Sequence, residues 1–200
     1  MPPPLVRPFG PDALLVEVAD AVAALDLAGF VRDAGLDAVE VVPAAETVLL
    51  DGVADREAVA AVLARWRPGE RDHDGTVVEV PTTYDGADLD DVAERWGTDR
   101  DGVVERHAAL TFVSAFCGFA PGFAYLAGLP DELAVPRLAT PRTRVPAGSV
   151  ALAGTWCGVY PTSSPGGWRL LGHTRATLWD QARPTPALLP PGTRVRFVPA

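Results

Sequence analysis

The chain contains no lysine, because all 17 of its basic residues are arginine. Lysine contacts the phosphates in a P-loop and forms Schiff bases with carbonyl substrates, and it is also the residue that carries biotin. A P-loop site, Schiff-base chemistry and a role as biotin carrier are therefore excluded for this chain.

Cysteine, basic charge and long apolar runs are also scarce. Two cysteines, Cys117 and Cys157, are too few and too irregularly spaced to indicate a disulfide framework or a zinc site. The net charge of -9 argues against nucleic-acid binding, which needs a basic stripe. No apolar run approaches the ~20 residues that span a bilayer, and the first residues lack the pattern of a secretory signal. We therefore expect a cytoplasmic protein.

The composition that is present suits a globular protein of one large or two small domains. The chain has 200 residues, of which 48% are hydrophobic and 22% are charged. Its pattern changes near Pro81: strand and helix patterns alternate before this residue, whereas short apolar runs separated by glycine and proline follow it. We expect two domains, at residues 1–80 and 81–200.

The first domain is expected to be a small α+β domain. The expected elements are a strand at 13–18, a helix that Asp20 caps, strands at 38–42 and 47–50, a helix after Asp55, and a last strand at 76–80. This β-α-β-β-α-β order predicts a ferredoxin-like arrangement.

The second domain is expected to be mainly β. A helical face over 89–96 precedes another helix, for which Thr98 is the expected N-cap. The expected strands lie within residues 110–116, 144–153, 158–160, 168–172 and 193–198. Many short strands with such turns indicate an all-β barrel or sandwich.

His107 is the candidate for proton transfer. Its spacing places it on the inner side of the helix after Thr98, near the C-terminus, where the helix dipole favours a protonated imidazole. The residue is either a general acid/base or anion ligand, or a hydrogen-bonded histidine at a domain seam.

An unusual block of aromatic and small residues runs from Gly118 to Leu126. Phe119, Phe123 and Tyr125 alternate with small residues, and Trp168 follows further along the chain. These aromatic rings either pack the barrel or form the wall of a ligand pocket, and the pattern alone favours neither interpretation.

Arginine and hydroxyl side chains cluster nearby. Among Arg137, Arg142 and Arg144 we favour Arg142 as a ligand-binding residue, because a guanidinium suits carboxylates and phosphates; the alternative is a solvated surface. Ser149 follows a glycine but lacks the surrounding Gly-x-Ser-x-Gly motif. It is therefore a better candidate for hydrogen-bonding a ligand than for a nucleophile.

A loop of small residues at 163–167 joins Tyr160 to Trp168. Such a loop either presents backbone N–H groups to an anion or makes an ordinary tight turn. His173 and Thr174 end the next strand and are candidates to face the same opening. The sequence shows no metal-binding, GxGxxG or Walker motif.

Three blocks together resemble one protein family. They are Gly118–Leu126, Thr140–Val150 and Tyr160–Trp168, and they resemble the B subunit of 5-oxoprolinase, a family also called kinase inhibitor KipI or allophanate hydrolase subunit 1. Pro136-Arg137 and Leu188–Pro199 fit the same family. The resemblance implies a small α+β domain followed by a cyclophilin-like β-barrel over residues 81–200.

The resemblance also implies partners. A homologous C subunit, which is KipA-like, and a third subunit would form an ATP-dependent 5-oxoprolinase that opens a lactam to glutamate, with this chain inactive alone. Other relatives form the carboxyltransferase part of urea carboxylase or inhibit a histidine kinase. Within this interpretation we expect Arg142, Ser149, Tyr160 and His173 to contact substrate, and His107 to transfer protons.

The sequence departs from the family pattern at two places. Trp156-Cys157 replaces the usual Gln-Thr, and His173 replaces an arginine. An arginine-to-histidine change removes a bidentate donor and makes charge depend on pH. The departures bear on the substrate rather than on the fold.

Overall fold

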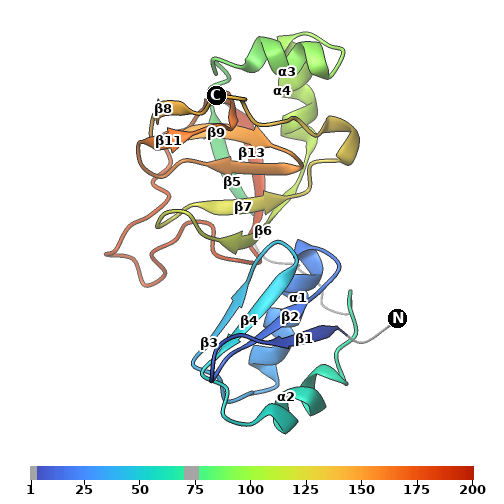
Figure 1. The fold of residues 1–200 in the computed structure, drawn as a ribbon. Coiled ribbons are helices and arrows are strands. Elements are labelled where there is room, and N and C mark those ends of the chain that lie inside the picture. Colours follow the sequence, from blue (N-terminus) through green and yellow to red (C-terminus); the bar gives the residue numbers. More distant parts are fainter. Residues whose placement is uncertain (1–3, 70–76) are drawn as a thin grey trace. The chain divides into compact units, whose positions relative to one another are not determined.

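A computed structural model describes residues 4–69 and 77–200, and the chain divides into two compact units (Figure 1). Each unit has its own hydrophobic core. Within the described residues, every helix is too short or too polar to cross a bilayer.

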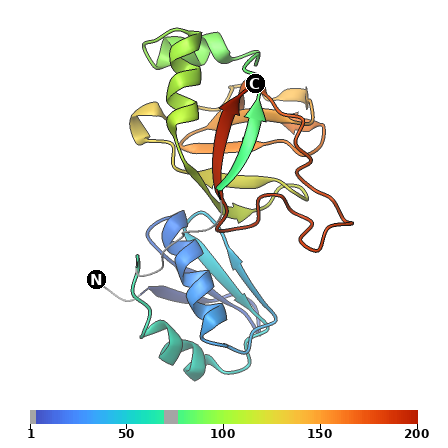
Figure 2. The ribbon, with the colours of Figure 1, turned by 180° about the vertical axis from the view of Figure 1, so that it is seen from behind.

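The first unit is a four-stranded antiparallel sheet with two helices. In sheet order its strands are β1 (Leu5–Pro8), β2 (Leu14–Glu17), β4 (Thr47–Asp51) and β3 (Glu40–Pro43), and its helices are α1 (Ala21–Asp33) and α2 (Arg56–Leu63). Helix α1 lies across one face of the sheet (Figure 2). Val16, Leu27 and Val48 are fully buried in the core that results.

Both helices begin where the sequence predicts. The Asp20 carboxylate accepts a hydrogen bond of 2.8 Å from the Ala23 N–H, and Asp55 accepts bonds from the N–H groups of Glu57 and Ala58. Each carboxylate satisfies N–H groups that the first helical turn leaves without partners. The predicted N-cap Asp20 is confirmed, and the helix predicted to follow Asp55 begins there with Asp55 as its N-cap.

The predicted last strand of this unit belongs elsewhere. Val77–Thr82 (β5) pairs in parallel with β13 (Arg194–Pro199) in the second unit, and Thr76 lies outside the described residues. The edge position in the first sheet is taken instead by β1, which the sequence did not predict as a strand. The ferredoxin-like arrangement is therefore not confirmed, because apolar alternation identifies a strand but not its partner.

The second unit is built on a seven-stranded mixed sheet. In sheet order the strands are β12 (Arg169–His173), β9 (Ser149–Ala153), β10 (Trp156–Val159), β7 (Ala124–Ala127), β6 (Phe112–Cys117), β13 and β5. Just after β5, Thr83 pairs with His173 at the end of β12 through backbone bonds of 2.9 and 2.8 Å. The sheet thus returns to its first strand, which confirms an α+β protein with a barrel-like sheet.

A two-stranded sheet and two α-helices complete the second unit. The small sheet pairs β8 (Arg142–Val145) with β11 (Ser164–Gly166). The helices are α3 (Leu89–Arg95) and α4 (Arg100–Ala109), and a 3-10 turn spans Asp131–Leu133. The N-cap of α4 is Asp99 rather than the expected Thr98, because the Asp99 carboxylate accepts from the Gly102 N–H at 2.9 Å.

Asp88 links the start of α3 to the barrel through side-chain hydrogen bonds. Its side chain makes no capping bond to the helix. One carboxylate oxygen instead accepts from Arg142 Nη2 at 2.7 Å and the other from the Leu170 N–H at 2.7 Å. Because Asp88 is only 7% exposed, these charge-assisted bonds form largely out of water.

We expect Asp88→Asn to lower the free energy of unfolding by about 2 kcal/mol, because an amide cannot accept from both donors and leaves Arg142 without its counter-ion. Urea denaturation measures the change. Asp90→Asn is the matched control two residues further along, since Asp90 forms an exposed ion pair with Arg100 and its loss should leave the midpoint unchanged. Equal midpoints for both variants would contradict the role given to Asp88.

Candidate functional site

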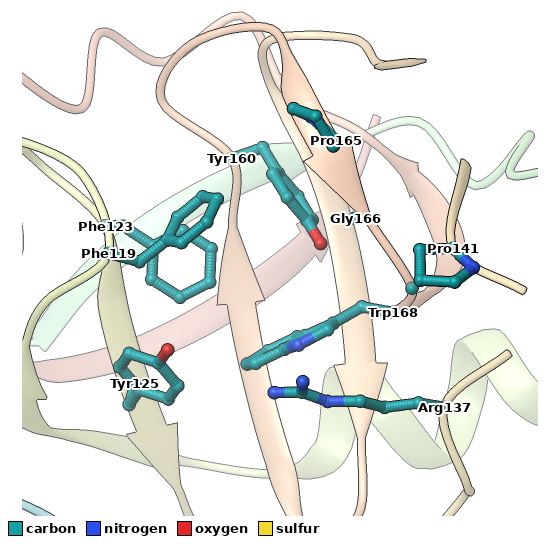
Figure 3. Close-up of a pocket in the computed structure, with 10 residues that line it drawn as sticks. Phe119, Phe123, Tyr125, Arg137, Pro141, Tyr160, Pro165, Gly166 and Trp168 are labelled. Atoms are coloured by element: carbon teal, nitrogen blue, oxygen red, sulfur yellow. The ribbon is translucent and has the colours of Figure 1, made fainter. Parts of the chain in front are cut away.

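A cavity of about 290 Å³ opens in the second unit, and its lining comes from the three blocks that stand out in the sequence together with Arg137, which precedes the second block (Figure 3). The lining residues are Phe119, Phe123, Tyr125, Arg137, Pro141, Tyr160, Pro165, Gly166, Gly167 and Trp168. Residues as far apart in sequence as Phe119 and Trp168, 49 positions from each other, thus line one aromatic pocket.

Strand β9 supports the pocket because both of its faces are buried. Val150 and Leu152 point into the barrel core, whereas Ala151 and Ala153 belong to a second cluster with the pocket aromatics. This alternation follows from the two-residue period of a strand. The two alanines have small side chains, which leaves room above the strand for aromatic rings.

The pocket wall is a set of aromatic rings that meet edge to face. The ring centroid of Phe123 lies 5.5 Å from that of Tyr160 and 5.4 Å from that of Trp168, and Tyr125 lies 5.7 Å from Trp168. Such T-shaped contacts are the favoured geometry of aromatic pairs. Phe123, Tyr160 and Trp168 are each less than 5% exposed, so their rings are held in place.

Phe119 forms the rim of the pocket. Its backbone is left-handed, with φ of 69°, and the residue is 61% exposed although its ring makes T-shaped pairs with Phe123 and Tyr160. A left-handed conformation is rare for a bulky residue. Hydrogen bonds from Gly118 to Phe123 and from Ala120 to Gly118 hold this turn.

The Tyr160 hydroxyl is a neutral donor inside the pocket. Burial raises the pKa of this phenol, whereas a hydrogen bond with the Trp168 backbone and, to a smaller extent, the cations Arg137 and Arg142 act in the opposite direction. In Figure 3 the hydroxyl points toward the strand that carries Gly166 and Trp168. It lies against bare backbone at Gly166, where a Cβ atom would be only 2.4 Å from the Tyr160 oxygen.

Arg137 is the charged residue of the pocket lining, and the sequence did not single it out. Its guanidinium carbon lies 5.8 Å from the ring centroid of Trp168, and Figure 3 shows the group alongside the indole. This is the geometry of a cation–π contact. The available signals were its place in the same cluster as Arg142 and the family match at Pro136-Arg137, but the sequence analysis favoured Arg142.

Arg142, the arginine that the sequence favoured, is held by other groups of the protein. Its guanidinium pairs with Asp88 and also donates to the Trp168 carbonyl at 3.4 Å. It does not line the pocket, although it is close enough to affect the pKa of Tyr160. The structure therefore gives Arg142 a supporting position behind the pocket.

Ser149 and His173 also lie outside the pocket lining. They face each other across β9 and β12. The Ser149 hydroxyl donates to the Pro146 carbonyl at 2.8 Å and closes a turn, and the His173 Nδ1 lies 2.9 Å from a carboxylate oxygen of Asp85. Of the four residues expected to contact substrate, only Tyr160 lines this pocket.

His107 is enclosed in the barrel core. Its ring packs between Phe112 and Phe197, with Nδ1 2.8 Å from the Tyr84 hydroxyl and Nε2 3.4 Å from the Cys157 sulfur. Complete burial lowers its pKa to about 3. The helix dipole favours a protonated imidazole at this position, but desolvation outweighs it and favours the neutral form.

Trp156 and Cys157, two of the three residues that depart from the family pattern, have different surroundings. Cys157 is fully buried against His107. Trp156 packs its ring edge-on against Phe116 and Tyr125, at centroid distances of 5.4 and 5.8 Å. Because Tyr125 lines the pocket, the departure at Trp156 changes the layer directly behind the pocket wall.

The comparisons identify the family. The profile of the carboxyltransferase domain, subdomain C and D, matches residues 4–189. The chain belongs to this family. Two curated relatives, both named as the B subunit of 5-oxoprolinase, come from Escherichia coli O157:H7 and Haemophilus influenzae and are 46% and 44% identical. The matches cover 72% and 64% of this chain and 67% and 61% of the relatives.

Solved structures share the fold of this family. The crystal structure of TTHA0988 superposes with a TM-score of 0.81 at 36% identity, covering 95% of this chain and 40% of that protein. The Kluyveromyces lactis urea carboxylase has a TM-score of 0.70 at 18% identity, covering 98% of this chain and 22% of the enzyme. This chain thus corresponds to less than half of either protein.

The buried imidazole predicts a dependence of stability on pH. The folded pKa of His107 is about 3, whereas the unfolded value is about 6.5, so the unfolded chain binds the proton first. This histidine therefore lowers the free energy of unfolding as the pH falls below about 6.5, by about 2 kcal/mol at pH 5, and the loss continues down to the folded pKa.

NMR titration of the His107 ring measures the folded pKa directly, and denaturation at pH 7 and pH 5 measures the loss of stability. His107→Gln should reduce the difference in unfolding free energy between the two pH values. An imidazole that titrates near its ordinary pKa in the folded chain would refute the prediction.

Adjacent glycines provide a test of the packing around Tyr160. We expect Gly166→Ala to displace the Tyr160 ring and to lower the free energy of unfolding by about 1–3 kcal/mol, the usual cost of overpacking. At Gly167 a Cβ would meet its nearest atoms at 3.7 Å, so Gly167→Ala is a matched control with little effect. Urea denaturation and the ring signals of the three tyrosines report the two effects. Unchanged tyrosine signals in Gly166→Ala would contradict the described contact.

Proposed function

We propose that this chain is the B subunit of an ATP-dependent 5-oxoprolinase and that its aromatic pocket binds the lactam. The observation that carries the proposal is the meeting of three sequence blocks around one pocket that holds a cation and a neutral phenol. The name shared by the two curated relatives supports the choice of reaction.

Opening a lactam to glutamate requires activation of a poor electrophile, which phosphorylation of the lactam oxygen by ATP would provide. In this proposal the chain binds and orients the lactam while the aromatic wall limits water. Tyr160 donates a hydrogen bond, since its raised pKa keeps the phenol protonated, and Arg137 attracts negative charge.

The pocket itself does not fit ATP. A volume of about 290 Å³ is at the lower limit of ligand pockets, which run from about 300 to 1,000 Å³. One arginine is a weak match for a triphosphate, and the chain has no lysine. We therefore assign ATP binding to two partners, a homologous C subunit and a third subunit, in a cytoplasmic complex.

The remaining expectations fare differently in this proposal. We keep a cyclophilin-like barrel for the second domain, and we replace the expected proton transfer by His107 with a structural role, because its ring is closed off by the core. The urea carboxylase likeness, at 18% identity, supports the fold alone, so a carboxyltransferase activity is not taken further. No feature of the described residues favours a histidine-kinase inhibitor over a component of an enzyme.

Reconstitution tests the proposal. The chain alone should hydrolyse no ATP, and its co-expression with both partners should give ATP hydrolysis that depends on 5-oxoproline and releases glutamate. The matched control is the same assembly without this chain, which should be inactive. Glutamate release by the chain alone, or an inactive complete assembly, would contradict the proposal.

A further inference from the structure

We infer that Arg137 anchors the carboxylate of the ligand in the aromatic pocket and so makes the site selective for a small acid over an uncharged lactam. The inference rests on the proposed function only in its choice of a lactam acid as the ligand. It assigns the selecting role to a residue whose position in the pocket only the structure reveals.

The first observation is that Arg137 carries a charge that its neighbours leave available. Among the described residues it has no hydrogen-bond or ion-pair partner, whereas Arg142 pairs with Asp88 and Arg169 with Asp91. Arg137 is also the one charged group in the lining, because no acidic residue contributes to it. The lining therefore carries a positive charge that an anion can neutralise.

The second observation is that the backbone around Arg137 is fixed. Arg169 Nε donates to the carbonyl of Pro136 at 2.8 Å, and the Leu138 N–H donates to the carbonyl of Gly167 at 2.8 Å. Val135 pairs with Gly154 through two further backbone bonds. Because this backbone is already held, binding at Arg137 orders a side chain but does not have to order a loop.

The third observation is the cation–π contact between the Arg137 guanidinium and the Trp168 ring. The contact at 5.8 Å places the planar group beside the indole while its N–H donors stay unpaired. Planar guanidinium groups stack on aromatic rings and bind carboxylates through two parallel hydrogen bonds. The contact with Trp168 thus orients the Arg137 guanidinium, and its N–H groups remain available to a ligand carboxylate.

Tyr160 provides a second polar contact in the same pocket. The charge of Arg137 is felt at the Tyr160 hydroxyl, since it opposes the effect of burial on the pKa of that phenol. A ligand with a carboxylate and a nearby carbonyl oxygen matches a guanidinium fork and a phenol donor. The small volume and the aromatic walls fit a compact ring between these two groups.

Calorimetry on the full-length chain and on the assembled complex compares two probes: 5-oxoproline, and 2-pyrrolidinone, which has the same ring without the carboxylate. We expect the wild-type pocket to bind 5-oxoproline more tightly, and Arg137→Gln to weaken it by about tenfold or more while leaving 2-pyrrolidinone unchanged. Arg137→Lys, which keeps the charge but loses the fork, should fall between them.

Arg144→Gln is the matched control, because Arg144 comes from the same cluster but contacts the Ser163 hydroxyl and does not line the pocket. It should change neither affinity more than about twofold. A readout specific to the site is the Trp168 indole N–H signal, one of five in the chain, assigned with Trp168→Phe. This signal should move when 5-oxoproline is added to the wild type and not to Arg137→Gln.

Equal affinity of wild type and Arg137→Gln for 5-oxoproline would overturn the inference, as would equal affinity of the wild type for both probes. Absence of binding in both the chain and the complex would also overturn it. If the complex turns over but Arg137→Gln keeps the wild-type KM, the proposed function stands and this inference fails. If 5-oxoproline binding depends on Arg137 in a complex that shows no turnover, this inference stands and the proposed function fails.

Discussion

The parallel pairing of β5 with β13 is the constraint on which the second unit depends. It joins Val77–Thr82 to Arg194–Pro199, and every other strand of the seven-stranded sheet lies between these segments in sequence. Bonds between Thr83 and His173 then close the sheet. Closure buries both faces of β9, with one face toward the barrel core and the other beneath the pocket. The aromatic site therefore exists because two distant strands meet.

Local signals predicted much of the fold, and pairing over distance accounts for what they missed. The side chains of Asp20 and Asp55 contact N–H groups two or three residues away, so the sequence is enough to place both helix starts. The partner of β5 depends on the competition among all strands for burial, which its alternating residues do not record. β1 was missed because it follows a proline-rich start, and proline is usually unfavourable in a strand.

The sequence likewise indicated the aromatic part of the site, which is local, but not the roles of the polar residues, which depend on distant partners. The aromatic blocks are local in sequence, and the structure gathers their rings around one pocket. The sequence ranked Arg142 first among the arginines, because the group that occupies it is Asp88, which is 54 residues away. For His107 the helix dipole was visible in the sequence, whereas the burial that outweighs it comes from strands that fold around the ring.

The strained turn at Phe119 has a consequence for the energetics of recognition. The Phe123 N–H bonds to the Ala120 carbonyl, and the Gly118 N–H returns to Phe123, so the rim is ordered before any ligand arrives. The loss of conformational entropy in this segment belongs to folding and not to association. The exposed ring also offers apolar area that remains in contact with water until something covers it. Binding at this rim can therefore release water without having to immobilise a loop.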